Sequence, residues 1–191
     1  MTMQIVEIVA AVFGLVCVIL TIRQNIWCWP AGLVQVTLYI LVFYEARLYS
    51  DMLLHVIYVA MQFFGWWNWL YGGENRTRLA VVRLAPAAGV FWSGLAVVGT
   101  LALGWSMSRY TNADLPYWDA AITVLSLIAQ WLMAKKTLES YLIWILVDVL
   151  AVGVYAVKAL YPSTLLYACF LCLATAGFLE WRKDLPKPAM A

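Results

Sequence analysis

The chain has 191 residues, of which 65% are hydrophobic and 12% charged, with a formal net charge of +2. A soluble chain is about half apolar and about a quarter charged, so these proportions exclude a soluble domain. The hydropathy also excludes a disordered chain, and the small net charge excludes a nucleic-acid partner. Because a membrane-spanning helix takes about 20 residues, we expect seven spans in a lipid bilayer, which leave no room for a soluble domain.

Uncharged runs bounded by charged residues predict where the spans lie. They fall near residues 3–22, 26–45, 51–71, 84–105, 117–134, 138–157 and 161–181. If the loops alternate sides, nine Lys and Arg residues lie on one side of the membrane and three on the other. By the positive-inside rule we expect the N-terminus outside and the C-terminus in the cytoplasm.

A shift of 112 residues lays the first three spans on the last three, with 11 identities over residues 5–69. Glu7 then falls on Asp119, Arg23 on Lys135, and Trp29 on Tyr141. Two three-helix units separated by one span enter the membrane from the same side, as in SWEET transporters. We therefore expect an all-α membrane protein with a SWEET-like, parallel 3+1+3 repeat. The predicted parts are repeat 1 (1–72), a cytoplasmic loop with linker helix 4 (73–112), repeat 2 (113–183) and a cytoplasmic tail (184–191).

The sixth span carries an acidic residue near the bilayer midplane. Tyr141, Trp144 and Asp148 recur at helical spacing on one stripe, which Tyr155 continues. A charge at that depth costs about 2.5 to 3.5 kcal/mol, and intramembrane acids usually face a transport pathway. The alternative is a protonated Asp148, or one hydrogen-bonded to a neighbouring helix. A tryptophan one turn from a carboxylate favours a flat, positively charged solute.

Three other spans place hydrogen-bonding side chains at similar depth. These side chains are Gln35, Gln62, Ser126 and Gln130. They predict either a central polar cavity or hydrogen bonds between helices. The third span also carries a polar and aromatic stripe that includes His55, Trp66 and Trp69, and the role of His55 stays open between ligand contact, proton carrier and packing.

The chain lacks the common motifs of membrane enzymes. No G-x-x-x-x-G-K-[ST], H-E-x-x-H or G-x-S-x-G sequence occurs in it. Cys169 and Cys172 have no second Cys or His pair for a tetrahedral metal site. We therefore expect no enzyme activity, no metal and no cofactor.

Five segments resemble the Pnu-type vitamin transporters, the family named after PnuC. They are GLVQVTLY (32–39), LYSDMLLHV (48–56), GWWNW (65–69), PYWDA (116–120) and YLIWILVDV (141–149). The last is similar to the W-x-x-W-x-x-x-[ND] motif of the family, which Trp144 and Asp148 match while Tyr141 replaces the first tryptophan. Gln35 stands where relatives often carry Asn.

The resemblance implies facilitated diffusion of a vitamin across the bacterial inner (cytoplasmic) membrane, with a cytoplasmic kinase that phosphorylates and traps it. Members of the family carry nicotinamide riboside, thiamine or riboflavin. Nicotinamide riboside is the expected substrate because it is the most frequent in the family, and thiamine is the alternative. Both carry a permanently cationic ring that fits Trp144 and Asp148, whereas riboflavin does not. Whether the protein forms a homo-oligomer stays open. The competing class is a non-transporting scaffold or receptor subunit, in which the midplane polar residues only join helices.

Overall fold

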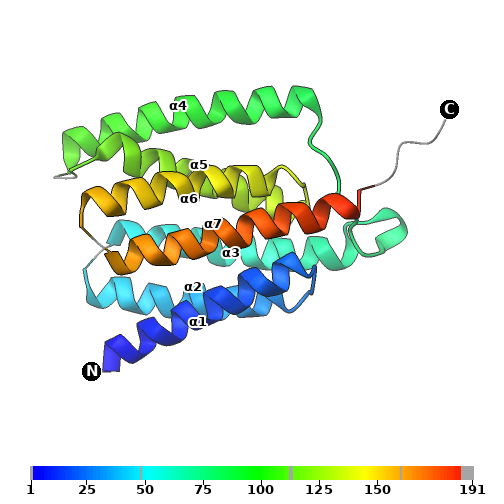
Figure 1. The fold of residues 1–191 in the computed structure, drawn as a ribbon, viewed down its shortest axis with the longest axis horizontal. Helices are drawn as coiled ribbons and strands as arrows, with labels where there is room; N and C mark the ends of the chain where they lie inside the picture. Colours follow the sequence, from blue (N-terminus) through cyan, green and yellow to red (C-terminus); the bar gives the residue numbers. More distant parts are fainter. Residues whose placement is uncertain (1, 48, 112–113, 160, 186–191) are drawn as a thin grey trace. The chain divides into compact units, whose positions relative to one another are not determined.

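The computed structural model describes residues 2–47, 49–111, 114–159 and 161–185. Within these ranges the regular secondary structure is helical (Figure 1), apart from one isolated β-bridge between Val82 and Thr137. Its elements are α1 (Thr2–Ile22), α2 (Cys28–Glu45), α3 (Tyr49–Tyr71), the short 3-10 helix η1 (Glu74–Arg76), α4 (Pro86–Tyr110), α5 (Pro116–Ala134), α6 (Ser140–Val157) and α7 (Tyr161–Lys183). The seven α-helices correspond to the seven predicted spans, which confirms the all-α membrane fold.

Six of the seven helices are long and apolar enough to cross a membrane. The remaining helix, α3, has 23 residues and is therefore about 34 Å long, which is enough to cross a membrane. It is not among the six because its polar and aromatic stripe lowers its mean hydropathy. The largest difference from the predicted boundaries is in α4, which continues to Tyr110 instead of ending at residue 105. Arg109 bounds the apolar run but does not end the helix, because long basic side chains extend from a helix end toward the interface.

Proline and left-handed backbone positions define where the helices begin and end. Pro86 and Pro116 stand at the first position of α4 and α5, where a missing backbone N–H costs nothing. Gln24 follows the end of α1, and Arg47 follows the end of α2; each adopts a positive φ, of 52° and 58°. Such left-handed residues commonly terminate a helix.

Contacts between helices divide the chain into two compact units, residues 1–80 and 81–191. In the first unit α1 packs against α2, and α2 packs against α3. In the second unit α4 packs against α5, α5 against α6, and α6 against α7. The predicted domain limit at residues 112–113 and most of the predicted tail lie outside the described residues.

The last three helices repeat the backbone path of the first three, offset by 112 residues. Adding 112 to the bounds of α2 and α3 gives the bounds of α6 and α7. The left-handed residues recur as well, since Gln24 corresponds to Lys136 and Arg47 to Ala159. The weak sequence repeat is therefore a repeat of local structure.

An aromatic pair occupies the same place in each repeat. The rings of Trp29 and Trp69 meet edge to face at 5.3 Å, and those of Tyr141 and Trp181 do so at 5.0 Å. Each α2 or α6 ring lies over a glycine of the following helix, Gly65 in the first repeat and Gly177 in the second, where a Cβ would collide with the ring. These glycines let the bulky rings fit between two helices.

Candidate functional site

Asp148 is the central residue of the candidate site in the second unit. It lies on α6 and is 3% exposed. No hydrogen bond or ion pair joins its carboxylate to any residue in the described part of the chain, although a buried carboxylate normally requires such partners. The sequence left open that Asp148 is hydrogen-bonded to a neighbouring helix. No such hydrogen bond is observed among the described residues.

The other residues of the α6 stripe differ in their surroundings. Trp144, one turn before Asp148, is half-buried. Tyr141 is buried against Trp181, and Tyr155 stacks on Tyr167 at 5.2 Å. Tyr141 and Tyr155 thus both pack against aromatic rings of α7. For Trp144, the third aromatic side chain of the stripe, no ring contact is observed among the described residues.

The helix α5, which packs against α6, supplies two further predicted residues. Ser126 is buried, and its hydroxyl donates a hydrogen bond to the Ile122 carbonyl at 2.7 Å. Thr123 donates in the same way to the Asp119 carbonyl at 2.9 Å. Since both hydroxyl protons are used within α5, neither links two helices as a donor. Gln130, one turn after Ser126, is half-buried and retains its amide groups for other partners.

In the first unit, the two predicted glutamines are held beside glycines. Gln35 of α2 lies against Gly14 of α1, where an added Cβ would be 2.7 Å from the amide nitrogen. Gln62 of α3 lies against Gly32 of α2, where an added Cβ would collide with the amide. The missing side chain at each glycine gives a long polar side chain room between two apolar helices.

Two buried polar atoms of the first unit lack a hydrogen-bond partner among the described residues. They are Oε1 of Gln62 and Nε1 of Trp29. As whole residues, Gln62 is 7% exposed and Trp29 is 3% exposed. One is an acceptor and the other a donor, so both are suited to a polar solute. The sequence indicated Trp29 only as a match in the repeat. Its unpaired indole nitrogen became visible only from the fold.

His55 packs in an aromatic cluster of α2 and α3. Its ring is 4.9 Å from Phe43, 5.6 Å from Tyr39 and 5.7 Å from Tyr58, and Nδ1 lies 2.9 Å from the Asp51 carbonyl oxygen. In the second repeat, Tyr155, Tyr167 and Phe170 take the positions of Phe43, His55 and Tyr58 and also contact one another. This equivalence favours packing for His55 among the three roles that the sequence left open.

The two predicted tryptophans of α3 differ in burial. Trp69 is 3% exposed and packs on Trp29, whereas Trp66 is half-buried. The neighbouring Trp67 is 67% exposed, which fits a residue of the interfacial aromatic belt.

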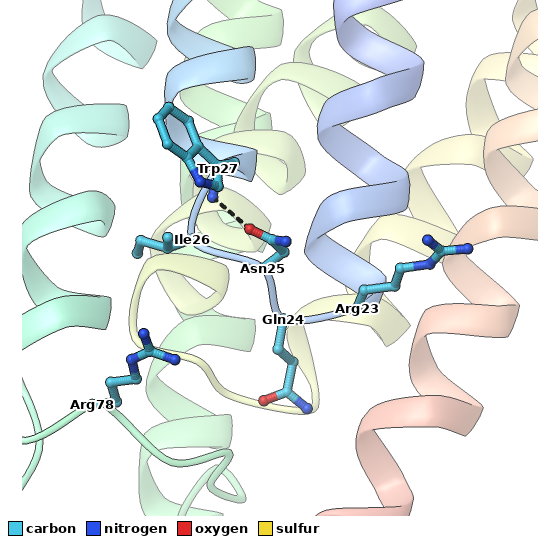
Figure 2. Close-up of a pocket in the computed structure, with 6 residues that line it drawn as sticks. All are labelled: Arg23, Gln24, Asn25, Ile26, Trp27 and Arg78. Atoms are coloured by element: carbon cyan, nitrogen blue, oxygen red, sulfur yellow. Dashed lines mark hydrogen bonds between the residues drawn. The ribbon is translucent and has the colours of Figure 1, made fainter.

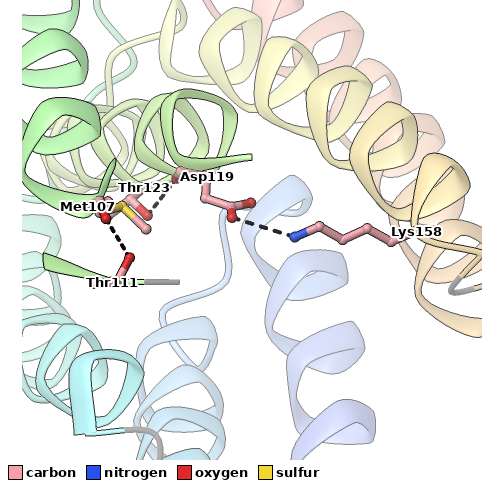
Figure 3. Close-up of polar contacts among 5 residues, drawn as sticks. All are labelled: Met107, Thr111, Asp119, Thr123 and Lys158. Atoms are coloured by element: carbon pink, nitrogen blue, oxygen red, sulfur yellow. Dashed lines mark hydrogen bonds and ion pairs between the residues drawn. The ribbon is translucent and has the colours of Figure 1, made fainter. Parts of the chain in front are cut away.

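An ion pair joins the first turn of α5 to the end of α6. Lys158 Nζ lies 3.5 Å from Asp119 Oδ2, and both side chains are about one third exposed (Figure 3). The first repeat has no such pair, since Ala46 corresponds to Lys158. Glu7, the counterpart of Asp119, lies beyond the first turn of α1.

Two further features concern metals and cavities. The described residues contain no group of three His, Cys, Asp or Glu side chains that is able to hold a metal ion.

A cavity of about 400 Å³ lies at the loop between α1 and α2, and a shallow apolar depression of about 740 Å³ lies on α4. Neither is lined by a residue of the predicted substrate site.

Comparison with known proteins relates the whole helical region to one family. The sequence model of the nicotinamide mononucleotide transporter family matches residues 4–183. The chain is 26% identical to the nicotinamide riboside transporter PnuC of Escherichia coli (strain K12), over 92% of this chain and 84% of that protein. It is 30% identical to PnuC of Neisseria mucosa, over 92% of this chain and 71% of the relative.

The fold also matches a solved structure. The crystal structure of the vitamin B3 transporter PnuC superimposes with a TM-score of 0.74 and 29% sequence identity, covering 93% of this chain and 80% of that one. The match extends over both repeats and is not confined to one three-helix unit.

Proposed function

The chain belongs to the nicotinamide mononucleotide transporter family, and we propose that it carries nicotinamide riboside across the membrane. Relatives that the chain matches over most of their length are named as nicotinamide riboside transporters. The observation on this chain that supports the proposal is the buried Asp148 carboxylate, which has no partner among the described residues and lies one turn from Trp144.

The chemistry of these two side chains fits a cationic ring. The pyridinium ring of nicotinamide riboside is flat and permanently charged, so it pairs with a carboxylate and stacks on an indole. A cation of this kind removes the cost of burying Asp148 alone. Thiamine also carries a cationic ring and is the alternative substrate, whereas riboflavin is neutral and leaves the carboxylate unpaired.

We propose further substrate contacts from the other predicted residues and from Trp29, which the sequence did not indicate as a contact. Gln62 and Trp29 offer a carbonyl acceptor and an N–H donor, which match the carboxamide of nicotinamide. Tyr141 and Trp69 contribute mainly by holding their helices, since each is packed against an aromatic partner. The remaining predicted contacts are Gln35, Ser126, Gln130 and Trp66. His55 was also predicted as a contact, but its packing against Tyr39, Phe43 and Tyr58 favours a structural role.

A binding screen tests the substrate. Purified protein is titrated calorimetrically with nicotinamide riboside, thiamine, riboflavin and reduced nicotinamide riboside, whose dihydropyridine ring is similar in size but carries no charge. We expect nicotinamide riboside to bind most tightly and the reduced form to bind at least about tenfold more weakly. Equal affinity for both forms contradicts the charge argument, and tighter binding of thiamine reassigns the substrate.

Variants connect the screen to the site. Asp148→Asn keeps the shape of the side chain and removes its charge, so it should weaken binding of the oxidised form and leave the reduced form unchanged. Asp119→Asn is the matched control, because Asp119 already pairs with Lys158 at the end of α6. An equal loss in both variants contradicts the assignment of Asp148.

We propose that transport is facilitated diffusion into the cytoplasm, where a kinase traps the vitamin. The proposed orientation places the N-terminus outside and the C-terminus in the cytoplasm, because the basic residues are concentrated in alternate loops. Labelling of cysteines introduced at Arg76 and at Arg109, with a reagent that does not cross the inner membrane, tests this orientation. Labelling at position 109 and not at 76 is the expected result.

Uptake distinguishes a transporter from a scaffold or receptor subunit. Liposomes containing the purified protein should take up nicotinamide riboside in a saturable way, and Asp148→Asn should abolish the uptake. High-affinity binding without uptake favours a receptor, and absence of both favours a scaffold.

A further inference from the structure

The loop between α5 and α6 is covered by the chain segment that precedes α4. The N–H of Val82 donates to the Lys136 carbonyl at 3.1 Å, and its carbonyl accepts from Leu138 N–H at 2.9 Å. The Glu139 carboxylate accepts the Leu84 N–H at 2.8 Å. Protein backbone therefore satisfies the polar groups on this side of the loop.

The equivalent loop of the first repeat has the same backbone form but opens into a cavity. Its residues Gln24, Ile26 and Trp27 correspond to Lys136, Leu138 and Glu139. Together with Arg23, Asn25 and Arg78 they line a space of about 400 Å³ (Figure 2). Trp27 replaces the acidic Glu139, so none of the six lining residues is acidic.

Two arginines give this cavity its charge. Arg23 and Arg78 stand on opposite sides of the Gln24 side chain in Figure 2, and both are exposed. No ion pair joins either guanidinium to a residue within the described ranges. By contrast, Lys135, the counterpart of Arg23, lies over the Trp131 ring at 5.3 Å. Exposed guanidinium groups without a carboxylate partner are able to bind phosphate through paired N–H donors.

Neutral donors add to the two charges. Asn25 Oδ1 accepts the Trp27 backbone N–H at 3.0 Å, which fixes the turn and leaves the Asn25 amide nitrogen as a donor. The side chain of Gln24, which also lines the cavity, carries a second amide. The lining thus combines two cations with amide donors, as expected for an anion.

The position of the cavity points to the membrane interface. Arg23 directly follows the apolar span that ends at Ile22, so it lies at the level of the lipid headgroups. Trp27 is 66% exposed, as is typical of tryptophans in the interfacial belt. A phosphate at this level is either part of a phospholipid or a free ion from the adjacent water.

We propose that Arg23 and Arg78, with the amides of Gln24 and Asn25, form a binding site for a phosphate group, supplied by the headgroup of an anionic phospholipid. The site lies outside the candidate substrate site, so vitamin binding and headgroup binding are separable properties. The bound headgroup would lie against the loop between α1 and α2. In the second repeat, residues 82–84 cover the equivalent loop between α5 and α6.

The test compares two charge-matched double variants of the full chain in detergent. R23Q/R78Q removes the two cavity arginines, whereas R76Q/R83Q removes two exposed arginines from outside the cavity, and both lower the net charge from +2 to 0. The probes are short-chain phosphatidylglycerol, phosphatidylcholine with the same acyl chains, and inorganic phosphate. Bound lipid is counted by native mass spectrometry, and affinity is measured as the thermal shift against ligand concentration.

We expect phosphatidylglycerol to bind the wild type and R76Q/R83Q equally, and R23Q/R78Q about tenfold to thirtyfold more weakly. Saturable binding of inorganic phosphate that displaces the lipid supports the site and assigns it to the free ion. Equal binding of phosphatidylglycerol and phosphatidylcholine, or equal losses in both double variants, overturns the proposal. If R23Q/R78Q does not fold, R78Q alone, at an exposed position, gives the same comparison against R76Q.

Discussion

Lys158 Nζ lies 3.5 Å from Asp119 Oδ2 and connects the end of α6 to the first turn of α5, a link that the first repeat lacks. Exposed ion pairs contribute about 0.2 to 1 kcal/mol, so the pair should stabilise the second unit only modestly. We expect Asp119→Asn to lower the melting temperature by about 1 to 3 °C at low salt. The charge-reversed pair D119K/K158D should recover most of this loss, and 0.5 M salt should reduce it. A loss that salt does not change contradicts an electrostatic role for the pair.

Gly32 is predicted to be essential for the packing of Gln62. A methyl group at position 32 collides with the Gln62 amide, and overpacking typically costs about 1 to 3 kcal/mol. Gly32→Ala should therefore lower the melting temperature, whereas G32A/Q62A should recover part of it by removing the colliding side chain. Gly153→Ala is the control, because nothing lies within 4 Å of its added Cβ. Equal effects at positions 32 and 153 contradict this explanation.

The edge-to-face pair of the second repeat should contribute strongly to stability. Trp181 is 0% exposed and packs on Tyr141, so Trp181→Ala should cost about 3 to 5 kcal/mol. Trp67→Ala, at a residue that is 67% exposed, should have little effect on the thermal unfolding of the detergent-solubilised protein. A small effect of Trp181→Ala contradicts the importance of the repeated aromatic pair.

Substitutions of Trp144 should separate cation–π attraction from simple packing. A desolvated cation–π contact contributes about 2 kcal/mol, so Trp144→Ala should weaken binding of nicotinamide riboside by about thirtyfold. Trp144→Phe should bind with intermediate affinity, since the phenyl ring attracts a cation less strongly. Calorimetry with reduced nicotinamide riboside is the control. Equal losses for both ligands contradict the cation–π role.

Transport should be uncoupled from ion gradients. The sequence offers one midplane acid, Asp148, and one histidine, His55, on different helices, rather than a chain of Asp, Glu and His residues reaching both faces of the membrane. The His55 ring also packs against Tyr39, Phe43 and Tyr58. A proton relay normally requires such a chain. Liposomes without a kinase should fill to the external vitamin concentration and stop. Accumulation above that level after a pH step contradicts this prediction.

The sequence by itself determined the membrane fold and its repeat. Whether a segment lies in water or in lipid depends on the composition of about 20 consecutive residues, which is readable without a structure. The offset of 112 residues, found from 11 identities, agrees with the helix ends and with the left-handed residues Gln24 and Lys136. Such features depend on the local chain and therefore persist in both repeats.

The depth of polar side chains was also predictable, because helical rise converts residue number into distance along a span. The partners of those side chains were not predictable in this way. The sequence placed Gln35 and Gln62 near the midplane but did not indicate that Gly14 and Gly32 leave the space for them. It placed Tyr141 and Trp144 on one stripe but did not indicate that Tyr141 packs on Trp181, whereas no aromatic ring contact of Trp144 is observed among the described residues.

Only the tertiary structure decided which polar groups are paired and which are not. It showed that Lys158 pairs with Asp119, and that the buried Asp148 has no partner among the described residues. It also showed that residues 82–84 cover one interhelical loop while the equivalent loop opens into a basic cavity. The physical reason is that partition into lipid depends on composition along the chain, whereas side-chain partners depend on how helices distant in sequence pack together.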